Sequence, residues 1–172
     1  PMISAKAQRA ELTKILDQAA ELKLNAIVLQ VRPESDALYD SKIDPWSYWL
    51  TAKQGRPPGD GGDPLKMAVQ QAHERGLELH AWFNPVRAVA NKSAPRASSH
   101  VSRKHPKWIL PGTGGTWLNP ALPEVRQRAI DVMTDVAKRY DVDGIHIDDY
   151  FYPYPKRVDG KMRPQFDDSK TY

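Results

Sequence analysis

Two neighbouring carboxylates, Asp148 and Asp149, follow a short segment in which apolar and polar residues alternate. In an extended chain Ile145 and Ile147 share one side, whereas His146 and Asp148 share the other. Carboxylates at the end of such a segment suit glycoside hydrolysis. In that reaction one carboxylate attacks or stabilises an oxocarbenium-like centre, and another protonates the leaving oxygen. The sequence therefore points first to an acidic catalytic group at the end of a strand.

Strand alternation separates the roles of the two acids, because adjacent residues of a strand point in opposite directions. We expect Asp148 to face the substrate as nucleophile or charge stabiliser. Asp149 would turn aside to hydrogen-bond loop amides or to brace Arg32 or Arg87. The alternative is that both acids cap the strand end in a turn. The general acid is expected on a later strand, with Glu34 and Asp36 as weaker local substitutes for it.

His146 has two possible roles beside Asp148. It can hydrogen-bond a sugar hydroxyl or hold Asp148 in its working orientation, or it can be a metal ligand. Metal-dependent barrels usually gather several His and carboxylate side chains, and here each of two strands offers one His, His80 and His146. We therefore expect neither a resident metal nor a cofactor, and a metal-dependent hydrolase or deacetylase stays as an alternative.

Aromatic and hydrogen-bonding residues cluster after the same strands. Aromatic rings stack on the C–H faces of sugars, and amide or guanidinium groups orient sugar hydroxyls. Each aromatic residue taken singly is better explained by packing within a loop, but as a group around one rim they favour a carbohydrate groove. The expected substrate-binding residues are Gln30, Arg32, Asp36, Tyr39, Trp82, Asn84, Arg87, Asn119, His146, Tyr150 and Tyr152.

Three helix-then-strand units position these residues. Apolar residues at helical spacing predict helices over residues 5–24, from Asp63 to Gly76, and from about Pro123 to 140. Asp63 is a good N-cap before Pro64, and Gly76 is a good helix terminator. Each helix is followed at once by a predicted strand, at residues 26–31, 79–84 and 144–150. The predicted order along the chain is therefore a helix followed by a strand, repeated three times.

Each predicted strand has one apolar face and one face that ends in polar groups. That pattern indicates helices outside and a cavity inside, as at the mouth of a barrel. The long strand-to-helix connections, residues 32–62 and 85–122, lie at the strand ends where such folds place their sites. A closed (β/α)₈ TIM barrel usually needs at least ~200 residues. We therefore predict an α/β fold that is a partial TIM barrel of about three units, over residues 1–155, with a polar, poorly ordered tail at 156–172 leading into the remainder.

Composition narrows the class of protein further. Of 172 residues, 40% are hydrophobic and 27% charged, which is typical of a globular domain. The net charge of +4 is only mildly basic. The densest basic stretch, residues 100–107, fits a solvated loop, so we expect no nucleic-acid partner.

No apolar run approaches the roughly 18 residues that cross a bilayer. No signal peptide is seen, and the absence of cysteine fits both a reducing cytosol and a bacterial envelope.

Several motifs resemble the glycosyl hydrolase-like 10 family. They are QVRPE at 30–34 leading to DALY at 36–39, HAWFNP at 80–85 with Arg87, WLNP at 117–120 with PEVR at 123–126, and DGIHIDDYFYP at 143–153. The resemblance covers nearly all of residues 10–155, and its last motif is long and specific. More distantly, residues 144–148 are similar to the fourth strand of amylase-type barrels, where the Asp is the nucleophile, although those enzymes carry Arg where this chain has His146.

The resemblance implies a TIM-barrel protein of the bacterial envelope or a secreted protein, preceded by a signal or lipoprotein sequence. Some members cleave peptidoglycan glycan strands stripped of their stem peptides. The expected function is thus hydrolysis of an amino-sugar polymer, with a polysaccharide as partner and Asp148 as the key carboxylate. The piece on its own is expected to be inactive. The alternatives are a non-catalytic glycan-binding module and the metal-dependent hydrolase.

Overall fold

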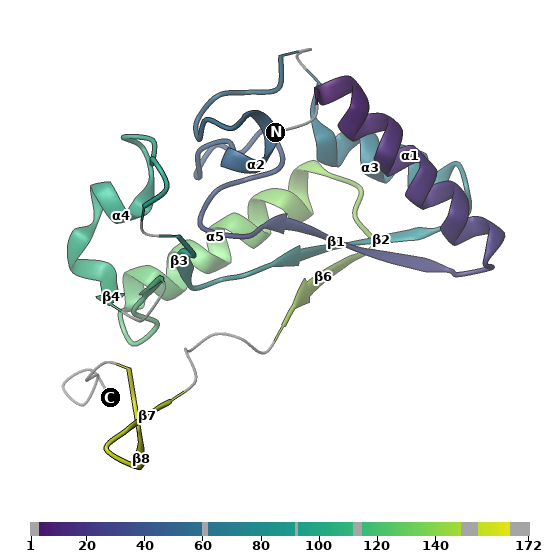
Figure 1. Ribbon diagram of the computed structural model, residues 1–172. Helices are drawn as coiled ribbons and strands as arrows, with labels where there is room; N and C mark the ends of the chain where they lie inside the picture. Colours follow the sequence, from purple (N-terminus) through teal and green to yellow (C-terminus); the bar gives the residue numbers. More distant parts are fainter. Residues whose placement is uncertain (1–3, 60–61, 92, 112–114, 149–154, 166–172) are drawn as a thin grey trace.

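The computed structural model describes residues 4–59, 62–91, 93–111, 115–148 and 155–165. Its centre is a three-stranded parallel sheet of β1 (Ala26–Arg32), β2 (Glu78–Phe83) and β6 (Gly144–Ile147), in that order. A helix precedes each strand: α1 (Ala5–Glu21), α3 (Pro64–His73) and α5 (Pro123–Arg139). Figure 1 shows the three strands running side by side beneath α1 and α3. The predicted helix and strand order is confirmed, and the sheet is not closed into a barrel.

Local chemistry starts and stops these helices where the sequence predicts. The Asp63 carboxylate accepts hydrogen bonds from the Leu65 and Lys66 amides at 3.0 and 3.2 Å, and Pro64 occupies the first turn of α3. After α3 the chain turns at Gly76, whose φ of +68° suits a residue without a side chain. No described helix is both long and apolar enough to pass through a membrane.

One hydrophobic core joins all three helices to the same face of the sheet. Its strand members include Leu79, Ala81 and Phe83, each fully buried. Leu16 of α1 and Val136 of α5 are also fully buried in this core. By strand alternation the opposite face carries the polar set, and we call it the inner face. The outer-face residues of the edge strand β6 are less covered than those of β2, because Ile145 and Ile147 are 39% and 43% exposed.

The two long connections contain more structure than the sequence predicts. The first includes the short helix α2 (Tyr48–Thr51). The second contains a small antiparallel sheet in the order β3 (Arg87–Val89), β5 (Thr116–Leu118) and β4 (Ile109–Pro111), with the short helices α4 (Val101–Lys104) and η1 (Pro106–Trp108). This sheet packs around its own hydrophobic cluster, which includes Val101, Trp117 and Val125. These short helices and strands are additional to the three helix-and-strand units that the sequence predicts.

The predicted polar tail also begins with regular structure. Strands β7 (Lys156–Val158) and β8 (Lys161–Arg163) form an antiparallel hairpin. Asp159 and Gly160 make its turn with φ angles of +50° and +76°. Asp-Gly is a favoured pair for such a two-residue turn because both positions need positive φ. The expectation of a poorly ordered tail is thus wrong for residues 156–163, and the sequence signal was this dipeptide.

Candidate active site

Three side chains form a row across the inner face. Gln30 of β1 pairs in register with Trp82 of β2, and Trp82 pairs with His146 of β6. Residues in register on neighbouring strands point to the same side of a sheet. The Trp82 and His146 rings meet edge to face, with centroids 6.2 Å apart. The structure therefore brings together one hydrogen-bonding, one aromatic and one titratable side chain, as strand alternation predicts.

Asp148 lies directly beyond the end of β6, two residues after His146. Phe83 pairs with Ile147, so the next residues along the two strands, Asn84 and Asp148, come at the same level. The Asp148 Oδ1 atom is buried and has no hydrogen-bond partner among the described residues. A buried carboxylate oxygen without a hydrogen-bond donor is energetically costly, and a donor from a bound ligand would remove that cost.

The lower part of the inner face holds His80 and Gly144, which pair in register one step below the row. A side chain at Gly144 would come within 2.8 Å of His80 Nδ1. The absence of a Cβ therefore leaves room for the imidazole, whose Nε2 lies 3.1 Å from the Glu78 carboxylate. In the described part of the chain no group of three or more His, Asp or Glu side chains is placed to hold a metal ion.

Arg32 does not follow the alternation. The register of β1 shifts between Gln30 and Arg32, so that Arg32 pairs with Phe83 of the outer face. Its side chain is 1% exposed, and its Nε donates to Asp44 Oδ2 at 2.7 Å. Nη1 donates to the Asn84 carbonyl at 2.7 Å. The register shift thus directs Arg32 toward groups of the protein itself, and its contact with a substrate stays a prediction.

Asp44 is shared between two arginines. Its second oxygen accepts from Arg128 Nη2 of α5 at 2.6 Å, and the Asp44 side chain is fully buried. The ion triad Arg32–Asp44–Arg128 therefore ties the end of β1, the following connection and α5 together. The sequence analysis missed Asp44 and Arg128. Nothing in the local sequence distinguishes Asp44 and Arg128 from other acidic and basic residues. Only the fold brings them together with Arg32.

Three more expected substrate-binding residues are buried in structural positions. Tyr39 is fully buried and packs edge to face on Tyr140 with centroids 5.7 Å apart; burial raises the pKa of its phenol. Asn84 is also fully buried, and its Oδ1 accepts from the Arg87 amide at 2.8 Å. Asn119 is 6% exposed and accepts from the Ala121 amide at 3.0 Å. These side chains shape the connections, and their contact with a substrate stays a prediction.

Asp36 and Arg87 lie in the connections beyond the strand ends. Asp36 Oδ2 accepts from Gln54 Nε2 at 3.0 Å and from the Tyr48 amide at 3.3 Å. The Arg87 carbonyl accepts from Ser35 Oγ at 3.0 Å, which joins the two connections. Asp149, Tyr150 and Tyr152, also expected at the site, lie outside the described residues.

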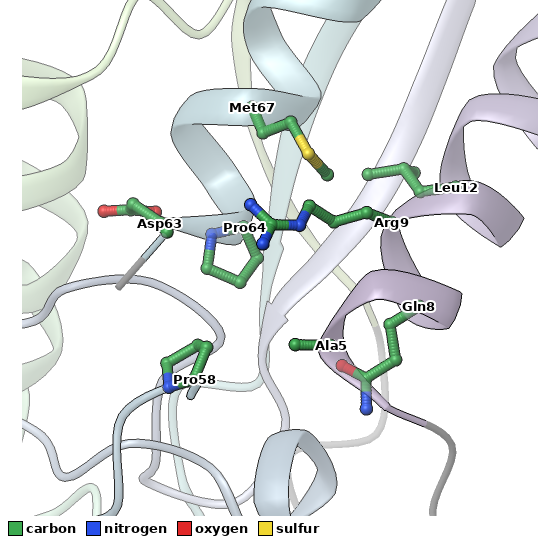
Figure 2. Close-up of a pocket in the computed structure, with 9 residues that line it drawn as sticks. Ala5, Gln8, Arg9, Leu12, Pro58, Asp63, Pro64 and Met67 are labelled. Atoms are coloured by element: carbon green, nitrogen blue, oxygen red, sulfur yellow. The ribbon is translucent and has the colours of Figure 1, made fainter. Parts of the chain in front are cut away.

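Two features away from the inner face carry none of the expected site residues. A hollow of about 60 Å³ lies between the N-terminal halves of α1 and α3. Figure 2 shows Leu12 and Met67 facing each other there, with Arg9 between the two helices. The second feature is Asp143, just before β6, which accepts from His73 Nε2 and from the Leu79 amide, both at 2.8 Å. These hydrogen bonds lower the pKa of Asp143, but they serve the junction between α3, β2 and β6.

Comparisons with known proteins agree with this fold. The family model described as Glycosyl hydrolase-like 10 matches residues 3–167. The chain is 41% identical over 154 residues to glycosyl hydrolase YngK of Bacillus subtilis, covering 88% of this chain and 30% of YngK. It is 36% identical over 162 residues to glycosyl hydrolase DigH of Escherichia coli K12, covering 88% of this chain and 36% of DigH. The chain thus spans about a third of the length of these relatives.

Solved glycosidase structures share the fold at low sequence identity. An α-galactosidase from Lactobacillus brevis is 18% identical with a TM-score of 0.53, and the match covers 80% of this chain and 18% of that one. A maltogenic α-amylase from Thermotoga neapolitana is 17% identical with a TM-score of 0.53, over 83% of this chain and 35% of that one. At this identity the likeness concerns the path of the backbone.

Proposed function

Because this chain belongs to the glycosyl hydrolase-like 10 family, we propose that the protein hydrolyses the glycosidic bonds of an amino-sugar polymer, with bacterial cell-wall glycan as the substrate. The proposal includes a (β/α)₈ barrel, of which β1, β2 and β6 with their preceding helices would be neighbouring units. In such barrels the reacting groups lie at the carboxyl ends of the strands. Asp148 occupies that end of β6.

One observation carries the proposal. Asp148 follows the row Gln30–Trp82–His146 at the strand end, and its Oδ1 is a buried acceptor with no partner in the described part of the chain. We assign Asp148 the role of nucleophile or charge stabiliser beneath the anomeric carbon. Trp82 would stack on a sugar ring, and Gln30 and His146 would hydrogen-bond its hydroxyls. A second carboxyl group must supply the proton to the leaving oxygen.

The test uses the full-length protein and glycan strands freed of their stem peptides. We expect Asp148→Asn to abolish release of soluble sugars while binding to the insoluble glycan is retained, because the amide keeps the shape of the side chain but cannot attack or carry the charge. The matched control is Asp141→Asn, since the Asp141 side chain is 96% exposed before the same strand. Cleavage by Asp148→Asn at the parental rate would remove Asp148 from the mechanism.

A second candidate, a non-catalytic glycan-binding module, is favoured by a separate observation. The residues that directly follow the three strands are Pro33, Asn84 and Asp148, so among the described residues Asp148 is the single carboxylate in this position. Under this candidate the parental protein binds the same glycan and releases no sugar. A metal-dependent hydrolase is the third candidate, and it predicts loss of cleavage on adding a chelator. The proposed substrate also implies a location in the bacterial envelope or outside the cell, which fractionation of cells producing the protein would test.

A further inference from the structure

A separate cavity of about 210 Å³ lies between the two long connections, and it includes none of the row residues Gln30, Trp82 and His146. One wall comes from the connection after β1, with Asp36, Trp49 and Gln54. The other wall comes from β3 and the segment that follows it. This second wall includes Ala88, Val89, Ala94, Pro95 and Arg96.

The two walls are fastened to each other by hydrogen bonds. The Glu34 carboxylate accepts from the Ala90 amide at 2.7 Å, and Gln54 Oε1 accepts from the Ala97 amide at 3.1 Å. His100 is fully buried, and its Nε2 lies 3.0 Å from the Glu34 carbonyl oxygen. Burial lowers the pKa of His100, which favours the neutral ring inside the wall. The cavity is therefore preorganised by links between segments far apart in the sequence.

Two polar atoms of opposite kind remain unpaired in these walls. Asp36 is 2% exposed, and its Oδ1 has no hydrogen-bond partner among the described residues, although its Oδ2 accepts from Gln54. Arg96 Nε is likewise buried and unpaired within the same part of the chain. The first atom accepts a hydrogen bond and the second donates one. A ligand that completes both must offer one donor and one acceptor.

The apolar and aromatic residues of the lining indicate which further groups the ligand has. Ala88 and Val89 are buried apolar residues of the lining, 0% and 3% exposed. Trp49 is 56% exposed and packs edge to face on Tyr48, with centroids 5.9 Å apart. An exposed indole beside a polar cavity is suited to stack on the C–H face of a sugar ring. Apolar residues inside the cavity are suited to cover a methyl group.

We propose that this cavity is a second carbohydrate subsite, which binds one acetamido-bearing sugar of the glycan away from Asp148. An acetamido group offers one N–H donor for Asp36 Oδ1, one carbonyl acceptor for Arg96 Nε, and a methyl group for the apolar wall. The inference rests on the proposed glycan substrate. The subsite anchors a long strand, so it determines affinity and the choice of acetylated polymer and takes no part in bond cleavage.

The test measures binding of a β-1,4-linked N-acetylglucosamine tetramer to the full-length protein by calorimetry. Its fully deacetylated counterpart and a glucose tetramer are the comparison ligands. We expect Asp36→Asn, Arg96→Lys and Trp49→Ala each to raise the Kd for the acetylated tetramer about tenfold, the usual effect of losing one hydrogen bond to a charged group or one aromatic contact. The matched controls Asp40→Asn and Arg56→Lys, which change side chains outside the cavity, should leave the Kd unchanged.

An NMR signal from the cavity itself distinguishes binding there from binding at the inner face. The Arg96 Nε–H resonance, assigned by its loss in Arg96→Lys, should shift when the acetylated tetramer is added and stay in place with the deacetylated one. Trp49→Ala and Arg96→Lys change partly exposed side chains, so we expect both variants to fold. They test the subsite even if Asp36→Asn unfolds.

An unmoved Arg96 signal, unchanged Kd values in Arg96→Lys and Trp49→Ala, or equal binding of the deacetylated tetramer would overturn the subsite. These results are independent of the catalytic proposal. Asp148→Asn should leave the Arg96 shift intact, and Arg96→Lys and Trp49→Ala should leave cleavage of a saturating substrate intact. A protein that binds through the cavity but never cleaves would contradict the hydrolase and support the subsite.

Discussion

The indole of Trp82 and the imidazole of His146 meet edge to face across two neighbouring parallel strands, with ring planes at 86°. This contact adds a side-chain interaction to the backbone ladder that pairs β2 with β6. Asp148 follows His146 by two residues, so Trp82 and His146 lie next to the acidic residue of the proposed site.

Replacing Trp82 by Ala should weaken glycan binding by five- to tenfold, because a stacking surface worth about 1 to 1.5 kcal/mol is lost. Trp82→Phe should recover most of that loss. The measurement is the KM for soluble glycan fragments, or the Kd where no turnover occurs. Trp108→Phe is the control, since Trp108 stacks on His105 at 3.9 Å in the second connection. Equal KM values for Trp82→Ala and the parent would show that the inner face does not hold the sugar.

Removing Asp44 should destabilise the protein strongly. Asp44→Ala leaves two arginines, Arg32 and Arg128, without their shared buried carboxylate, and breaking a buried pair of this kind costs about 3 to 5 kcal/mol. The free energy of unfolding from urea titration measures the effect. The control is Asp40→Ala, because the Asp40–Lys42 pair is 47% and 64% exposed and should contribute less than about 1 kcal/mol. Similar losses in both variants would contradict the structural role of the triad.

Asp143 should make the free energy of unfolding decrease as the pH falls into the acid range. Its pKa is lowered by the hydrogen bonds from His73 and the Leu79 amide, so the charged form favours the folded state. This contribution is complete above the unfolded pKa of about 3.9 and is lost as the pH falls through the lower folded value. Asp143→Asn should thus be less stable than the parent at pH 6, and the difference should shrink below about pH 4. If the difference in stability persisted undiminished to pH 2, it would result from the change in side-chain structure and not from the charge of Asp143.

Gly115 should not tolerate a side chain. A Cβ atom there would lie 2.5 Å from the Val89 carbonyl oxygen, a backbone atom that cannot move without disturbing β3. Gly115→Ala is expected to cost about 1 to 3 kcal/mol and to lower the melting temperature. Gly59→Ala is the control, because a Cβ there meets nothing within 4 Å. A melting temperature unchanged by Gly115→Ala would mean that β3 and β5 can separate freely.

The repeated order of helix and strand could be predicted from the sequence because it depends on local periodicity. Helical spacing, the Asp63–Pro64 start and alternation over residues 79–83 and 144–148 each act within a few residues of the chain. The alternation also predicted which side chains share a face, and Gln30, Trp82 and His146 follow it. The role of Asp148 stays a prediction, since no measurement of activity bears on it.

Tertiary structure decided everything that depends on a partner distant in sequence. A shift of register after Gln30 paired Arg32 with Phe83, and Arg32 there forms an ion pair with Asp44, which also pairs with Arg128. Strand alternation alone cannot reveal such a shift. The full burial of Tyr39 and Asn84 likewise depends on packing between distant segments and could not be predicted from the local sequence. The cavity beside Asp36 arises where residues from two separate connections meet. Local sequence sets the direction of a side chain within its own element, whereas long-range packing determines what it meets.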